Sequence, residues 1–195
     1  MFFSGLLIAA AMMFQTDIDD TGTAVARPMG NAILEPDTGS YYQVFEFYGR
    51  PPYTWEHANR MVKGYHYQGR EGRLAEVKSG NTHYFLLVNF PDIRTNPMWI
   101  GLHVECNETA EIKWQDGSSL SEQSFRAWND GTPKNISRTC REHKESGMIL
   151  PVFYQAHELG VRWEVAQEKA NMKYMMVEFP VPTEAEQEKT DTAKP

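Results

Sequence analysis

The chain has 195 residues, 41% of them hydrophobic, and 26 acidic residues against 19 basic ones give it a formal net charge of −7. This length and apolar content are sufficient for one substantial buried core. The acidic balance excludes the electrostatic footprint of a nucleic-acid-binding protein. We therefore expect one main folded domain and no nucleic-acid partner.

The first segment of the chain is apolar: residues 2–14 read FFSGLLIAAAMMF. This run is shorter than the roughly 20 residues that a membrane-spanning helix needs, but its length suits the central region of a signal peptide. Small-residue cleavage signals occur at residues 9–11, within the run, and at residues 24–26, after it, although no basic residue precedes Arg27. We expect residues 1–26 to be a signal peptide, with a buried N-terminal strand or helix as the alternative. An uncleaved segment is the only membrane contact that we expect.

The next elements are two predicted helices behind a strand. Residues 27–40 contain prolines and glycines and are expected to be an extended linker. Residues 40–48 are rich in Tyr, Phe and Val, as strands are. Thr54 can cap a helix, and Ser79 or Asn81 can cap a second one. The apolar residues expected on these helices are Trp55, Ala58, Met61 and Val62 on the first, and Tyr84, Phe85 and Val88 on the second.

Short strands and turns follow. Strands are expected near 98–104 and 111–115, and Asp116 with Gly117 predicts a tight turn. Trp99, Trp114 and Trp128 are expected to be core residues. Residues 129–147 are polar and are expected to form a long loop. Residues 148–153 and 173–181 read as buried closing strands, and residues 182–195 as a disordered acidic tail.

The spacing of these motifs resembles the C-type lectin-like domain, whose pattern is W-I-G-L, then W-x-D-G, then W-x-x-G-x-P-N. The matching residues are Trp99-Ile100-Gly101-Leu102, Trp114, Asp116, Gly117, Trp128, Gly131 and Pro133. Trp55, Ala58 and residues 72–77 resemble the family's first helix and G-x-L-A strand, and Trp163 and residues 174–178 resemble its W-N-D and closing strands. The resemblance covers residues 41–181. It implies an α+β fold with two helices flanking small antiparallel sheets and a long irregular ligand loop.

The cysteines differ from the family pattern. One family disulfide joins the first helix to the last strand, and the matching positions here are Val62 and Val177, which can hold that junction by packing. The two cysteines, Cys106 and Cys140, lie near the long loop. In an exported protein an even count favours a disulfide, and two buried free thiols are the alternative.

The resemblance also raises the question of calcium. Sugar-binding members hold the ion with E-P-N and W-N-D motifs, but these positions read Thr132-Pro133-Lys134 and Trp163-Glu164-Val165. A hydroxyl and an ammonium replace a carboxylate and an amide, and calcium needs six to eight oxygens. The string Trp128-Asn129-Asp130 spells W-N-D by coincidence, since it lies where W-x-x-G-x-P-N begins. We expect no cofactor and no standard calcium site.

Other acidic residues leave room for a displaced calcium site. Asp130, Glu142, Glu145 and Glu158 lie in or near the loop, and the alternative is that they pair with its basic residues.

Two glycosylation sequons begin at Asn107 and Asn135, and they matter only in a eukaryotic secretory protein.

No catalytic motif is present. The six histidines have no metal-ligand spacing, and neither a G-x-S-x-G elbow nor a P-loop occurs. We expect a secreted or cell-surface recognition or adhesion module, not an enzyme, that binds a glycan or protein ligand. A calcium-dependent lectin and a structural domain of a surface assembly are the alternatives, and the oligomeric state stays open. The expected ligand-binding residues are Asp130, Lys134, Asn135, Arg138, Arg141, Glu145, Trp163 and Glu164.

Overall fold

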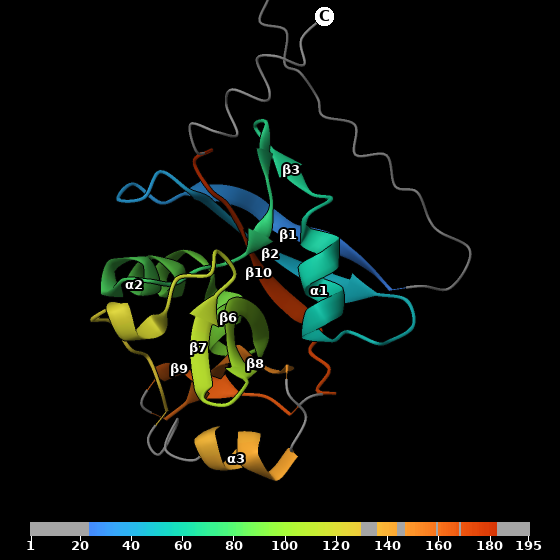
Figure 1. Ribbon diagram of the computed structural model, residues 1–195. Helices are drawn as coiled ribbons and strands as arrows, with labels where there is room; N and C mark the ends of the chain where they lie inside the picture. Colours follow the sequence, from blue (N-terminus) through green and yellow to red (C-terminus); the bar gives the residue numbers. More distant parts are fainter. Residues whose placement is uncertain (1–23, 130–135, 144–146, 159, 168, 183–195) are drawn as a thin grey trace, which may run out of the picture.

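The computed structural model describes residues 24–129, 136–143, 147–158, 160–167 and 169–182. Its main feature is an eight-stranded sheet with the order β1-β2-β10-β6-β8-β9, in which β5 also pairs with β10 and β7 with β6 (Figure 1). The strands of this sheet are β1 (Val25–Leu34), β2 (Tyr41–Tyr48), β5 (Arg73–Leu74), β6 (Met98–Cys106), β7 (Ala110–Trp114), β8 (Met148–His157), β9 (Gly160–Val165) and β10 (Tyr174–Phe179). A separate small hairpin joins β3 (His66–Tyr67) to β4 (Arg70–Glu71).

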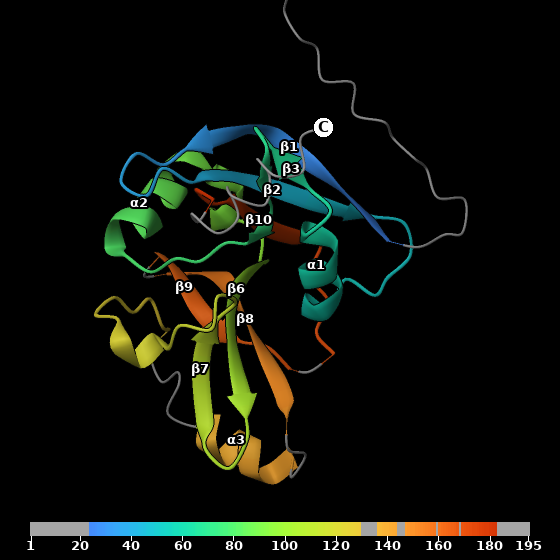
Figure 2. The ribbon, with the colours of Figure 1, turned by 45° about the horizontal axis from the view of Figure 1, so that its top comes forward.

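The sheet has two parts that meet at β10. Strands β1, β2 and β10 cross the upper part of the molecule, and strands β6, β7, β8 and β9 extend below them (Figure 2). Strand β10 pairs antiparallel with β2 but parallel with β6, through Tyr174 opposite Met98 and Met175 opposite Trp99. This short parallel joint is what makes one continuous sheet from strands that are far apart in the sequence.

Helix α1 (Trp55–Val62) follows the expected pattern. The Thr54 hydroxyl accepts a hydrogen bond from the His57 amide at 3.3 Å, and the helix buries Trp55, Ala58 and Val62. Trp55 Nε1 donates to the Ile100 carbonyl at 2.7 Å, which attaches the helix to β6. Val62 on α1 and Val177 on β10 are fully buried in one apolar cluster. Apolar packing therefore joins the first helix to the last strand, where the family that the sequence resembles has a disulfide.

Helix α2 (Gly80–Asn89) begins after Ser79, whose hydroxyl accepts from the Thr82 amide at 3.0 Å, so Ser79 and not Asn81 is the cap. The helix buries Thr82 and Leu86. Of the apolar residues expected on it, Phe85 packs against the core, whereas Tyr84 and Val88 are 69% and 53% exposed. Short 3-10 turns follow at η1 (Pro91–Arg94) and η2 (Leu120–Glu122).

Two expectations about irregular segments are wrong. The segment expected as a linker is strand β1 over most of its length, because its backbone pairs with β2 from Val25–Tyr48 to Leu34–Tyr41. The loop expected over residues 129–147 contains a helix, α3 (Ile136–His143). Its residues Ile136 and Cys140 are one helical turn apart and both are buried, which gives the helix an apolar face.

The core contains three of the tryptophans without any solvent exposure: Trp99, Trp114 and Trp163. The prediction for Trp99 and Trp114 is therefore confirmed. Trp128 is only partly buried, and its ring packs edge-on against Trp163 at 5.4 Å between centroids. Most of the segments expected to be a signal peptide (residues 1–26) and a tail (residues 182–195) lies outside the described residues, at 1–23 and 183–195. Residues 24–26 are part of the folded domain, because Val25 and Ala26 pair with β2 and Ala24 and Ala26 are buried.

One histidine beneath the sheet predicts acid sensitivity. Burial, with a smaller effect from Arg162, lowers the pKa of His83 from 6.5 to about 4, and its Nδ1 lies 2.8 Å from the Tyr154 hydroxyl. The unfolded chain therefore binds a proton at a higher pH than the folded chain does. Stability should fall as the pH falls from about 6.5 to about 4. Urea unfolding at neutral and mildly acidic pH should show a smaller acid loss in His83→Phe than in the parent, while the exposed His66→Phe keeps the parent's loss. Equal acid losses in all three proteins would contradict this assignment.

Candidate functional site

The expected ligand-binding residues fall into two groups. Asp130, Lys134, Asn135 and Glu145 lie outside the described residues, as does the Thr132-Pro133-Lys134 position. Arg138 and Arg141 lie on α3, and Trp163 and Glu164 lie on β9. Trp163 is fully buried, so it supports the strand from inside the core and cannot itself touch a ligand on the surface.

A polar cluster surrounds Glu164. Asn129 Nδ2 donates to Glu164 Oε1 at 3.0 Å, and His157 Nε2 lies 2.6 Å from the same oxygen, within ion-pair distance when the imidazole is protonated. Among the described residues, Glu164 is the only partner recorded for this imidazole nitrogen, which is itself buried. The side chains of His157 and Glu164 are 27% and 28% exposed. An amide, a carboxylate and an imidazole are thus held together on β9, at the end of β8 and at residue 129.

The backbone explains why these residues meet. Trp128 forms a parallel bridge with Trp163, the Asn129 amide donates to the Trp163 carbonyl at 3.2 Å, and the Trp163 amide donates to the Ala127 carbonyl at 2.6 Å. Residues 127–129 therefore lie along β9. Glu164 is one of the expected binding residues, and Asn129 is the first residue of the expected loop, whereas His157 was not expected here. The letters Trp128-Asn129 contained a signal for Asn129, whereas nothing in the sequence pointed to His157.

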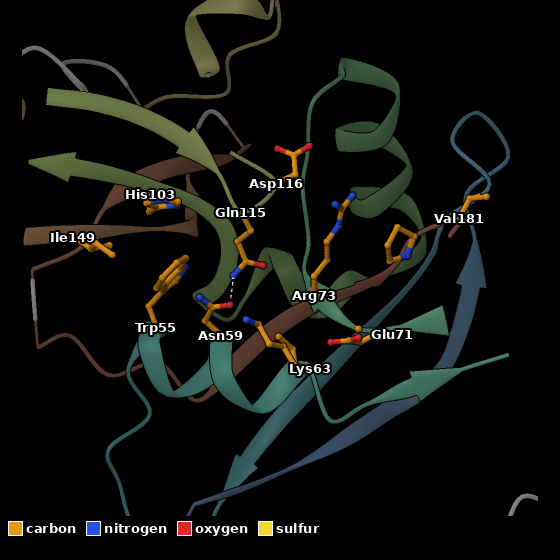
Figure 3. Close-up of a pocket in the computed structure, with 13 residues that line it drawn as sticks. Trp55, Asn59, Lys63, Glu71, Arg73, His103, Gln115, Asp116, Ile149 and Val181 are labelled. Carbon is orange, nitrogen blue, oxygen red and sulfur yellow. Dashed lines mark hydrogen bonds between the residues drawn. The ribbon is translucent and has the colours of Figure 1, made fainter. Parts of the chain in front are cut away.

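A second feature was not expected from the sequence. A cavity of about 610 Å³ opens between α1, the strands β6 and β7, and β5 (Figure 3). Its lining residues are Trp55, Asn59, Val62, Lys63, Glu71, Gly72, Arg73, His103, Gln115, Asp116, Ile149, Pro180 and Val181. Within the described part of the chain, none of the lining comes from α3, β9 or residues 127–129, so this cavity is separate from the Glu164 cluster.

A buried network of charges lies behind the cavity. Glu178, which is 3% exposed, accepts from Arg73 Nε and Nη2 at 3.2 and 3.1 Å, from the Ser40 hydroxyl at 2.8 Å and from the Glu76 amide at 3.0 Å. Burial raises the pKa of Glu76, although Arg73 and Lys78 lie 3.2 and 2.7 Å from its Oε2. This network joins β5, β10 and β2, and it fixes the position of Arg73 at the cavity wall.

The turn after β7 closes this network. Asp116 accepts from the Ser118 amide and hydroxyl, forms an ion pair with Lys78, and donates through its amide to Glu76 Oε1 at 2.9 Å. Burial on its own raises the pKa of Asp116, but Lys78 and Ser118 outweigh that effect and lower it to about 2. Asp116 therefore stays ionised at neutral pH and anchors the turn that the sequence predicted.

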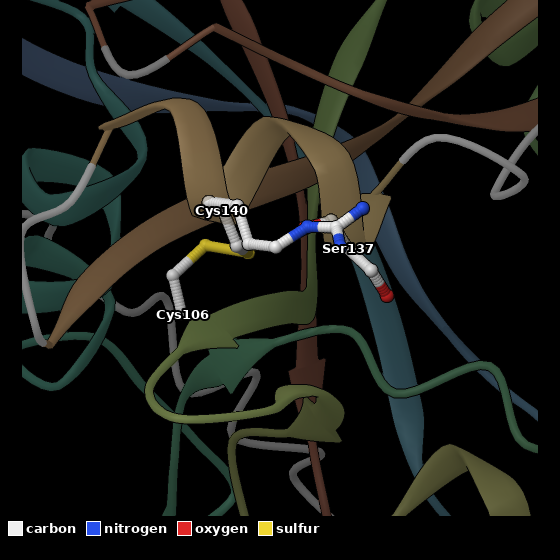
Figure 4. The surroundings of a disulfide bond; sticks show 4 residues. Cys106, Ser137 and Cys140 are labelled. Carbon is white, nitrogen blue, oxygen red and sulfur yellow. A yellow bond between two sulfur atoms is a disulfide. The ribbon is translucent and has the colours of Figure 1, made fainter.

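The third feature is the helix at the end of the β6–β7 hairpin. Cys106 and Cys140 form a disulfide, with their Cα atoms 5.1 Å apart, so the expected pairing is confirmed over two free thiols (Figure 4). The disulfide attaches α3 to β6 while Arg138 and Arg141 remain exposed, and Arg141 Nε donates to the Ser137 carbonyl at 3.2 Å. Arg138 and Arg141, two of the basic residues of the expected loop, are therefore presented by an anchored helix. Asn107, the first sequon, lies exposed in the β6–β7 turn.

The described residues include no group of three or more His, Cys, Asp or Glu side chains that could hold a metal ion. Because Thr132 to Lys134 lie outside those residues, the calcium expectation stays a prediction. No helix among the described residues is long and apolar enough to cross a membrane.

Comparison with solved structures identifies the fold. The C-type lectin domain of murine dendritic cell inhibitory receptor 2, solved in complex with an N-glycan, superposes with a TM-score of 0.51 at 14% identity, covering 73% of this chain and 91% of that one. Rhodocetin has a TM-score of 0.42 at 24% identity, with 73% and 91% covered. EMS16, an antagonist of the collagen receptor integrin α2β1, has 0.43 at 17% identity, with 73% and 92% covered. No protein-family model matches the sequence, and no curated protein does. The chain has an α+β, C-type lectin-like fold.

Proposed function

We propose that this chain, with its C-type lectin-like fold, is an exported recognition module that binds a glycan through the segment of residues 129–147 and the side of the molecule that carries α3 and β9. The murine domain with the same fold was solved with an N-glycan, which favours a glycan as the ligand class to test first. Low sequence identity limits that comparison to the fold, so the residues of this chain have to carry the argument.

The cluster of Asn129, His157 and Glu164 is the observation that carries the proposal. A hydroxyl group donates one hydrogen bond and accepts others, so it pairs well with a carboxylate and an amide held side by side. Glu164 can accept from a sugar hydroxyl, and Asn129 Nδ2 has a second hydrogen to donate. Both side chains are partly exposed, so a ligand can reach them without opening the core.

We further propose that binding does not use the standard calcium site. Val165, at the third position of the W-N-D motif, packs its partly buried side chain against the core and has no oxygen to offer. Lys134 places an ammonium where sugar-binding members have an amide, and it would repel a cation at close range. Direct hydrogen bonds from protein side chains then replace ion-mediated contacts.

Export is the third part of the proposal. The uncharged run over residues 2–14 has the length of a signal-peptide core, and small-residue cleavage signals occur within it and after it. A disulfide between Cys106 and Cys140 fits an oxidising compartment. N-terminal sequencing of the natural protein should find a mature start after Ala11, because cleavage after Ala26 would remove Ala24 and Ala26, which are buried in the core. An intact Met1 in a cytosolic fraction would contradict export.

Reversing the exposed charges of α3 should weaken binding without unfolding the domain. Arg138→Glu combined with Arg141→Glu should leave the thermal midpoint nearly unchanged, because exposed charges contribute little to stability. Affinity for the glycan found on an array should fall roughly tenfold at low salt and less at high salt, since screening weakens exposed charge interactions.

The matched control is Arg50→Glu with Arg60→Glu, which makes the same charge change at exposed positions outside this side of the molecule. It should bind like the parent. If the α3 reversal binds like the control at low salt, the basic residues of α3 are not part of the contact surface. If the parent binds a protein and no glycan, and the α3 reversal weakens that binding at low salt, the binding surface is supported but the ligand is a protein.

A further inference from the structure

We propose that the cavity between α1 and the β6–β7 strands is a second ligand site, which takes a neutral saccharide of one or two rings and needs no metal ion. Its volume of about 610 Å³ lies within the range of small-molecule sites in proteins. The Glu164 cluster contributes no residue to it, so this site goes beyond the proposed function and is testable apart from it.

A short chain of hydrogen bonds orients the amides in the middle of the cavity. The Leu74 amide donates to Gln115 Oε1 at 3.1 Å, and Gln115 Nε2 donates to Asn59 Oδ1 at 2.6 Å (Figure 3). Because the Asn59 oxygen is already used, its Nδ2 group is left as a donor. The cavity therefore presents an amide whose orientation is fixed and whose two hydrogens have no partner among the described residues.

Further donors and one acceptor face the same space. Lys63, the C-cap residue of α1, lies four residues after Asn59, and its ammonium forms no hydrogen bond or ion pair with another described residue. Arg73 uses Nε and Nη2 for the buried network, which leaves Nη1 without a partner there. Glu71 is exposed, and its carboxylate has no partner among the residues that the structure describes. Donors and a carboxylate around one cavity complement hydroxyl groups, which both donate and accept.

The charges of the lining favour a neutral ligand. Lys63 and Arg73 are opposed by Glu71 and Asp116, and burial lowers the pKa of His103, which keeps that imidazole neutral. A strongly acidic or basic ligand would therefore meet as much repulsion as attraction.

The apolar part of the lining argues against a peptide. Trp55 and Val62 are 3% and 0% exposed and form a closed apolar wall, and Val181 is an exposed apolar side chain of the lining at 47%. A peptide that binds a groove needs several apolar pockets for alternate side chains, and one exposed valine does not supply them. A sugar ring, with a shallow apolar face and hydroxyls at its rim, needs only contact with the edge of this wall.

The test is an NMR titration of the full chain in chelator, in which backbone amide shifts report the binding site. The probes are glucose, galactose, mannose, N-acetylglucosamine and cellobiose, with glucuronate and glucosamine as charged comparisons. At least one neutral sugar should shift the amides of Asn59, Gln115 and residues 71–73, with a dissociation constant on the order of 1 mM. Shifts confined to residues near Glu164 would support the proposed function but overturn this one.

Variants separate the site from the fold. Asn59→Asp keeps the acceptor for Gln115 but removes the donor, so the domain should stay folded and bind the sugar at least about tenfold more weakly. Lys63→Met should weaken binding as well, whereas Arg60→Gln, on the same helix but outside the lining, should bind like the parent. Absence of shifts with every neutral sugar, binding of only the charged probes, or an unchanged affinity in both Asn59→Asp and Lys63→Met would each overturn the proposal.

Discussion

Trp163→Ala is expected to lower the free energy of unfolding by about 3–5 kcal/mol, the usual loss for a fully buried aromatic side chain. Trp163 has no solvent exposure, and the rings of Trp114, Phe125 and Trp128 pack edge-on around it at 5.4–5.7 Å between centroids. Removal of the indole leaves these rings facing a void. Because β9 also carries Glu164, the same change should disturb the candidate site.

Chemical denaturation of the purified variants measures this effect. Trp128→Ala should cost clearly less than Trp163→Ala, because Trp128 is only partly buried. Trp163→Phe, which keeps an aromatic ring, should lie between the parent and Trp163→Ala. If Trp128→Ala proved as destabilising as Trp163→Ala, full burial of the Trp163 indole would not be the reason for its large contribution to stability.

Arg73→Met is expected to cost about 3 kcal/mol, at the low end of the usual 3–5 kcal/mol for breaking a buried ion pair, because the Arg73 side chain is 30% exposed. The change removes the only cation that lies against the buried carboxylate of Glu178 in the described structure. Glu178 would then keep the Ser40 hydroxyl and the Glu76 amide as donors, but its charge would have no partner.

A second substitution distinguishes a charge effect from lost packing. Arg73→Met with Glu178→Leu removes both charges, and the double variant should be more stable than Arg73→Met alone. Lys173→Met, which removes the partner of Glu46 at the surface, should change stability little. If the double variant is the least stable of the set, the network contributes mainly through packing and not through charge compensation.

The parts of the fold that the sequence predicted correctly depend on local signals. Thr54 and Ser79 are cap residues with an apolar face after them, and both caps are present. The glycine of the W-I-G-L strand is required by packing. A Cβ at Gly101 would lie 2.6 Å from the Leu74 carbonyl oxygen, so only glycine allows β5 to approach β6 this closely. The two helices of the C-type lectin-like fold could therefore be located from separated motifs.

The errors occurred where long-range pairing decides the structure. Residues 27–34 contain Pro28 and Gly30 and look like a linker, yet β1 is an edge strand, where a proline is tolerated. Helix α3 has only a short apolar face, formed by Ile136 and Cys140, and the disulfide holds that face against β6. Neither the pairing partner of β1 nor the anchor of α3 is visible in a local window of sequence.

The candidate site was only partly predictable for the same reason. Glu164 follows the tryptophan of a recognisable motif, so its position on β9 was expected. His157 reaches the cluster because β8 and β9 pair through His157 and Gly160, and Asn129 reaches it because Trp128 bridges to Trp163. The cavity beside α1 depends on the contact between Asn59 on α1 and Gln115 after β7, residues that are 56 positions apart.

The measurement that tests the central proposal most directly is glycan-array binding by the parent protein and Glu164→Gln, each with calcium and with chelator. The parent should bind the same glycans in both conditions, and its melting temperature should not change with chelator, because no ion stabilises the folded state. Glu164→Gln should stay folded and lose that binding by at least roughly tenfold. Binding that disappears with chelator and returns with calcium, or that is unchanged in Glu164→Gln, would contradict calcium-free recognition at this site.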